Sequence, residues 1–132
     1  MERLQRLLWP GRPHSPPHRD HPHHLGALLL ARRAGPRPRR RIQRHLLGLT
    51  HYLYHRSTIS IDPVCYLQDL FTTESARGRG VATALIQAVY REAQRAHASR
   101  VYWQTHETNE TAQRLYDKLA ERSGFIVYRH IL

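Results

Sequence analysis

The residues best suited to bind a charged ligand lie in one short run, Arg77-Gly78-Arg79-Gly80-Val81-Ala82. Glycine lets the backbone approach a ligand closely, and a helix that begins at Gly80 would point unpaired N–H groups and a positive dipole end at a pyrophosphate. The two arginines add positive charge without a metal ion. The same spacing also suits a simple tight connection between a strand and a helix, so the run alone leaves both interpretations open.

Two apolar segments must position this run. The apolar residues from Cys65 to Thr72 predict a strand before it. After it, apolar side chains recur at spacings of three and four, the period of an amphipathic helix that packs on a sheet. These side chains are Val81, Leu85, Ala88, Val89, Ala93 and Ala96.

Further elements are predicted on both sides of the run. Alternating side chains from Leu47 to His55 predict a strand, and the turn chemistry of Ser57 to Pro63 separates it from a second strand, Val64 to Thr72. A strand from Ser99 to Thr105, a helix from Asn109 to Gly124 and a strand from Phe125 to Ile131 follow. The order strand, strand, helix, strand, helix, strand predicts an α/β sheet covered by helices.

The inner face of the second helix is predicted from its own spacing. Asn109 supplies an N-cap, and the apolar positions that follow share one side of the helix. They are Ala112, Leu115, Tyr116 and Leu119.

The basic charge is concentrated in the first third of the chain. The whole sequence has 132 residues and a net charge of +11, but residues 1–45 hold 11 arginines and two carboxylates, whereas residues 46–132 hold ten basic and eight acidic side chains. We therefore expect a basic Pro/Arg/His-rich segment over residues 1–45 and a single folded domain over residues 46–132.

The composition of the first segment favours little stable secondary structure. Seven prolines interrupt it between Trp9 and Arg44, and short helices are conceivable only at Glu2 to Leu8 and His24 to Arg33. Its histidines lack a completing ligand set, so we predict no metal site. With 20 arginines and one lysine in the chain, a second hypothesis is translation from a shifted reading frame, which translating the DNA in its other frames would test.

The single cysteine and the lengths of the apolar runs indicate where in the cell the protein would function. Cys65 is the single cysteine, and its place in an apolar strand predicts a buried thiol and not a nucleophile. The apolar run from Leu25 to Ala31 is too short to span a bilayer. We expect a soluble cytoplasmic protein without a membrane partner.

Two separate motifs carry a family resemblance. Leu70-Phe71-Thr72 followed by Arg77 to Ala82 matches a strand and an R/Q-x-x-G-x-G/A loop, and the second motif is Asn109, Ala112, Leu115 and Tyr116 followed by Gly124-Phe125. In this order they resemble the GNAT superfamily of acetyl-CoA-dependent N-acetyltransferases over Leu46 to Leu132. The closest similarity is to the branch of the histone-and-other-protein acetyltransferases and their bacterial relatives.

The resemblance implies a mixed sheet flanked by helices, with acetyl-CoA as co-substrate and no metal. It also implies that the part of the fold before Leu46 is atypical or missing, including much of the acceptor pocket. The residues it assigns to acetyl-CoA are Leu70, Phe71, Thr72, Arg77, Gly78, Arg79, Gly80, Val81, Ala82, Thr83, Asn109, Ala112 and Tyr116.

The implied reaction is direct attack of a primary amine on the thioester. Tyr116 matches the family tyrosine near the sulfur and would protonate the leaving thiolate. Asp69 and Glu107 are candidates for the base, and the choice stays open because histidine is a common general base and three histidines are also candidates. These are His51, His55 and His106.

Two other functions and a further partner stay open. The chain could be a truncated or frame-disrupted acetyltransferase that at most binds its co-substrate, or a basic-arm protein that binds nucleic acid. No aromatic residues interleave with the arginines of residues 37–44, so nucleic acid is not the partner we expect. Besides the acceptor amine, an open sheet edge favours a homodimer.

Overall fold

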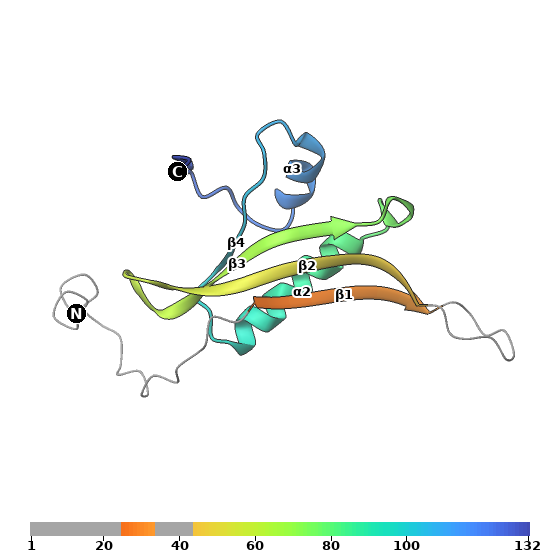
Figure 1. Cartoon of the computed structure of the whole chain (residues 1–132), viewed down its shortest axis with the longest axis horizontal. Coiled ribbons are helices and arrows are strands. Elements are labelled where there is room, and N and C mark those ends of the chain that lie inside the picture. Colours follow the sequence, from red (N-terminus) through yellow and green to blue (C-terminus); the bar gives the residue numbers. More distant parts are fainter. Residues whose placement is uncertain (1–24, 34–43) are drawn as a thin grey trace, which may run out of the picture.

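Four strands form one mixed sheet in the order β1-β2-β3-β4 (Figure 1). The computed structural model describes residues 25–33 and 44–132, so the predictions for Glu2 to Leu8 and for the histidines of residues 14–24 lie outside the described residues. The strands are β1 (Leu25–Arg33), β2 (Arg44–Ser57), β3 (Ser60–Thr72) and β4 (Val101–Tyr102). This confirms the predicted α/β class.

The first three strands are antiparallel and the last is parallel. β1 pairs with β2 and β2 with β3 in antiparallel fashion, whereas β4 pairs with β3 in parallel. The turn between β2 and β3 is shorter than predicted, because only Thr58 and Ile59 lie outside the strands and Pro63 is part of β3. The parallel pair needs a crossover, which α2 (Val81–Arg95) supplies.

α2 packs against one face of the sheet. Its buried side chains are Val81, Leu85, Ile86, Val89 and Ala93. Opposite them lie the buried Thr50, Tyr52, Cys65 and Leu67 of β2 and β3. Gly48 allows the close approach, because a Cβ there would meet Val81 Cγ1 at 3.0 Å and Leu85 Cδ1 at 3.1 Å. Most of the predicted helical stripe is confirmed. Ala88 and Ala96 are only half-buried, and Ile86 is buried in addition.

The prediction of a helix over His24 to Arg33 is wrong. The leucines of this segment belong to β1, which pairs with β2 from Leu25 to Arg33. Three consecutive leucines fit a helix and a strand equally well. Here they form a strand because the edge of β2 is available for pairing. The sheet thus extends into the segment that we separated at residue 45, and the domain division itself stays a prediction.

The second half of the chain is less regular than predicted. β4 has two residues in place of the seven from Ser99 to Thr105, and no strand forms from Phe125 to Ile131, where Phe125 is 91% and Tyr128 89% exposed. α3 (Glu110–Tyr116) ends before Gly124, in turns that run to Ala120. Among the described residues, no strand pairs with the chain from Trp103 to Thr105 or from Phe125 to Ile131, and a run of β-forming residues does not make a strand without such a partner.

Candidate functional site

A cleft opens where β3 and β4 separate. The two strands pair only at Cys65 with Val101 and Tyr66 with Tyr102, after which β3 continues to Thr72 without a strand on that side among the described residues. The cleft measures about 380 Å³. Its lining residues are Leu67, Gln68, Asp69, Leu70, Phe71, Trp103, Gln104, Thr105, Asn109 and Tyr116. The edge of β3 here offers free backbone N–H and C=O groups to an extended ligand.

A β-bulge shapes the β3 side of the cleft. His51 pairs with Asp69 and Tyr52 with Leu67, so Gln68 is the extra residue. The Thr50 hydroxyl donates a hydrogen bond of 2.7 Å to the Asp69 carbonyl oxygen, which satisfies an acceptor at the irregular position. The Asp69 carboxylate accepts a hydrogen bond of 3.1 Å from His51 Nδ1. The bulge therefore holds one carboxylate at the cleft.

Tyr116 closes the cleft from α3. Its ring meets Trp103 edge-to-face with centroids 5.3 Å apart. The neighbouring Tyr90 of α2 donates a hydrogen bond of 2.9 Å to the Leu119 carbonyl oxygen, which ties the turn after α3 to α2. Burial raises the pKa of Tyr116 above the usual value of tyrosine. The phenol is thus neutral at physiological pH and has a proton to donate.

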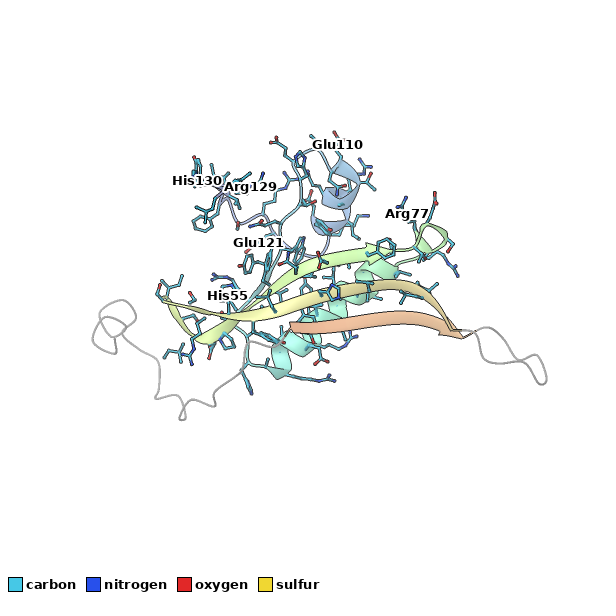
Figure 2. All side chains as sticks on the ribbon, in the orientation of Figure 1. His55, Arg77, Glu110, Glu121, Arg129 and His130 are labelled. Carbon is cyan, nitrogen blue, oxygen red and sulfur yellow. The ribbon has the colours of Figure 1, made fainter. Side chains whose placement is uncertain are left out.

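The glycine run forms a turn between the short 3-10 helix η1 (Glu74–Ala76) and α2. Gly78 and Gly80 have φ values of 69° and 75°, and no atom lies within 4 Å of the place where a Cβ would stand on either residue. Gly80 is the N-cap of α2, and no side chain from the described part of the chain caps the first N–H groups of the helix. Figure 2 shows Arg77 at this turn, beyond the end of β3. The turn can receive an anion.

The structure brings part of the predicted site together. Asp69, Leu70, Phe71, Asn109 and Tyr116 all line the cleft. Asn109 also caps α3, since its Oδ1 accepts a hydrogen bond of 3.3 Å from the Ala112 backbone. The run from Arg77 to Thr83 forms the turn and the start of α2, while Thr72 and Ala112 lie outside the cleft lining.

Glu107 does not line the cleft. It is exposed in the loop between β4 and α3, where its carbonyl oxygen accepts a hydrogen bond of 2.7 Å from Gln113 Nε2. Five further residues line the cleft that were not predicted from the sequence: Leu67, Gln68, Trp103, Gln104 and Thr105. The last three directly follow the two-residue β4, so an early end of this strand would have been the signal.

Cys65 is buried, as predicted. It is 0% exposed, and burial raises the pKa of its thiol to about 11. Thiolate chemistry at neutral pH is therefore disfavoured. Within residues 25–33 and 44–132, no group of three or more metal-ligating side chains comes together, and no helix is long and apolar enough to cross a bilayer.

The structure combines a sheet split by a cleft, a glycine turn before a helix and a neutral tyrosine at the cleft. The chain matches the acetyltransferase (GNAT) family over residues 1–120, and it belongs to that family. The match confirms the family resemblance and extends it into the first third of the chain.

One curated relative is the D-amino-acid N-acetyltransferase HPA3 of Saccharomyces cerevisiae. It is 39% identical over 83 residues, which cover 63% of this chain and 52% of that protein. The chain therefore spans about half the length of this relative.

Solved structures share the fold. An integron cassette protein of Vibrio cholerae superposes with a TM-score of 0.60 at 26% identity, covering 65% of this chain and 54% of that one. A ribosomal-protein-alanine N-acetyltransferase of Brucella melitensis superposes with a TM-score of 0.62 at 18% identity, covering 70% and 67%. A soil-metagenome aminoglycoside acetyltransferase also has a TM-score of 0.62, at 23% identity, covering 67% and 59%. These likenesses support the fold.

Proposed function

We propose that this chain transfers an acetyl group from acetyl-CoA to a primary amine by direct attack, without an acyl-enzyme. The observation that carries the proposal is the cleft between β3 and β4, which has a free strand edge on one wall and Tyr116 on another. The single thiol is buried, which agrees with a reaction that needs no cysteine nucleophile.

Acetyl-CoA would lie along the cleft with its phosphates at the glycine turn. The backbone of Leu70, Phe71 and Thr72 would pair with the pantetheine arm as a strand does, and Asn109 would contact the arm from α3. The N–H groups from Arg77 to Thr83 would face the pyrophosphate, since the dipole of a helix start favours negative charge. The open space beside Gly78 and Gly80 fits this placement.

The thioester supplies an activated acetyl group, and the protein must manage two protons. Tyr116 would donate one to the departing thiolate. Asp69 and Glu107 are the carboxylates proposed as the base that takes a proton from the acceptor amine. Of these two, Asp69 lines the cleft. Ala112 would support Asn109 at the start of α3, where its N–H meets the asparagine side chain.

The acceptor is proposed only as a class. Primary amines of small molecules, polyamines and protein lysines all have the required nucleophile. Because one relative is named a D-amino-acid N-acetyltransferase, D-amino acids are the first acceptors to test. The assignment to the histone-and-other-protein branch is likewise a proposal.

Two further proposals concern the setting of the protein. The segment from Phe125 to Leu132 is exposed along its whole length and carries six large apolar side chains beside Arg129 and His130. This favours a homodimer that would cover the apolar side chains. Sedimentation equilibrium tests this, and a monomer at all concentrations would exclude it. We also propose a cytoplasmic location, which cell fractionation tests.

Calorimetric titration of acetyl-CoA is the decisive experiment. Gly80→Asp and Gly80→Asn form a matched pair, because both residues tolerate a positive φ and only the first adds negative charge. We expect saturable binding to the wild type and at least about tenfold weaker binding to Gly80→Asp than to Gly80→Asn, or about 1.4 kcal/mol.

The alternatives predict other results. A folded wild-type chain that does not bind acetyl-CoA would favour a disrupted product. Equal affinities in the two variants would contradict the phosphate position. Binding to nucleic acid that falls steeply with salt would instead support a basic-arm function.

A further inference from the structure

His51 and Asp69 form a pair on the face of the sheet that α2 does not cover. The neighbours of His51 in β2, Thr50 and Tyr52, are buried toward α2, so the His51 side chain points to the opposite face. The bulge at Gln68 turns Asp69 to this same face. Asp69 also lines the cleft, and its carboxylate Oδ2 lies 3.1 Å from His51 Nδ1.

We infer that His51 is the general base that deprotonates the acceptor amine, with Asp69 as its positioning residue. The inference rests on the proposed acetyl transfer and assigns a step that the proposal left to a carboxylate. A carboxylate only accepts hydrogen bonds, so the proton of the neutral imidazole lies on Nδ1. The lone pair of Nε2 is then available, and Nε2 has no hydrogen-bond partner in the part of the chain that the structure describes.

The other candidates are arranged for different contacts. His55 Nε2 lies 2.9 Å from the Tyr102 hydroxyl, and its Nδ1 lies 2.8 Å from a backbone carbonyl oxygen, so both ring nitrogens are engaged. His106 Nδ1 faces the Thr108 hydroxyl at 2.8 Å in the exposed loop before α3. Glu107 lies in the same loop, outside the cleft lining. Of the three histidine side chains compared, that of His51 is the one that bonds to a residue of the cleft lining.

Among the residues that the structure describes, few other titratable groups lie near His51. β3 contributes Asp69 and, two pairs further along, Tyr66, and β4 contributes Tyr102 beside Tyr66. The β1 residue opposite His51 is Ala27, and α2 lies on the other face of the sheet. Within residues 25–33 and 44–132, Asp69 is therefore the charged group in direct contact with the imidazole.

The proton balance of the step is complete. His51 Nε2 takes one proton from the ammonium form of the acceptor and later releases it to solvent. The neutral nitrogen of the acceptor amine then forms the C–N bond with the acetyl carbon as the C–S bond of the thioester breaks. Tyr116 gives its proton to the thiolate of CoA. The nitrogen of the acceptor carries an excess proton after the attack, and Tyr116 regains a proton from it as the amide forms. The net products are the amide, free CoA and one proton.

The test compares His51→Asn with His97→Asn. The asparagine amide at position 51 can still donate to Asp69 but cannot act as a base, whereas His97 is an exposed residue with a φ of 54° that asparagine tolerates. We measure kcat/KM for acetyl transfer to a D-amino acid, or to the best acceptor of an amine panel, from pH 6 to 10, together with acetyl-CoA affinity by calorimetry.

We expect His51→Asn to lower kcat/KM roughly 100-fold at pH 7 and to leave acetyl-CoA affinity unchanged. The loss should shrink above the pKa of the acceptor amine, because the amine is then already neutral. Asp69→Asn, which keeps an acceptor for Nδ1–H, should cost less, about tenfold. His97→Asn should match the wild type.

The possible failures are distinct. A wild type that binds acetyl-CoA but acetylates no amine would overturn the proposed function and this inference with it. An active wild type with an unchanged pH profile in His51→Asn would overturn only the inference. Loss of acetyl-CoA affinity in His51→Asn would show a structural role for His51 and would equally overturn it.

Discussion

At the scale of single residues, the environment of Tyr116 separates binding from chemistry. Its ring packs against Trp103, while its hydroxyl is the group proposed to donate a proton. Tyr116→Phe removes the hydroxyl and keeps the ring contact. We expect kcat to fall roughly 100-fold with acetyl-CoA affinity within about twofold of the wild type. The control is Tyr128→Phe at an exposed position, which should change neither.

The protonation of Tyr116 predicts how the reaction rate changes at high pH. Because burial raises the pKa of Tyr116, the acid form persists to higher pH than in a free tyrosine. The wild-type rate should therefore not decline from loss of this proton until the pH exceeds the usual tyrosine pKa near 10. A decline below pH 9 that is absent in Tyr116→Phe would mean that the pKa of Tyr116 is not raised.

At the scale of elements, the bulge in β3 depends on one buried hydroxyl. Thr50 is 0% exposed and donates to the Asp69 carbonyl oxygen at 2.7 Å. Thr50→Val keeps the shape of the side chain but leaves this acceptor without its partner. We expect the free energy of unfolding to fall by about 1–3 kcal/mol in chemical denaturation, and kcat/KM to fall because Asp69 is less well held.

An exposed threonine provides the comparison. Thr58→Val, in the turn between β2 and β3, should stay within about 0.5 kcal/mol of the wild type. Equal stability of the two variants would mean that the Thr50 hydroxyl does not support the bulge.

The elements that the sequence predicted well depend on local signals. The apolar stripe of α2, the glycine at its start and the Asn109 cap are each defined within a few residues. The cleft depends on where β3 and β4 stop pairing, a contact between residues far apart in the chain, so Trp103 and Gln104 could not be identified. The same limit explains the error at β1, where leucine spacing suits a helix and a strand.

At the scale of the whole molecule, β1 decides how much of the chain belongs to the fold. It lies at the edge of the sheet opposite β4, and α2 contacts it as well as β2 and β3 (Figure 1). The family match from residue 1 agrees with a role for this strand. If β1 forms in the native protein, residues before Leu46 contribute to its stability. A segment translated from a shifted reading frame would not be expected to make such a contribution.

Gly26 provides a test of β1 in solution. A Cβ at Gly26 would lie 2.1 Å from Cζ of the Tyr52 ring, a side chain that packs in the core beside α2. Gly26→Ala should therefore lower the free energy of unfolding by about 1–3 kcal/mol. Alanine at an unobstructed strand position would instead stabilise the protein by roughly 0.5–1 kcal/mol. On a Tyr52→Leu background the ring is absent, so the same change should be neutral or stabilising, a coupling that a double-mutant cycle measures. Stabilisation or no effect on both backgrounds would mean that β1 does not pack on the sheet, and the folded domain would then begin near Leu46.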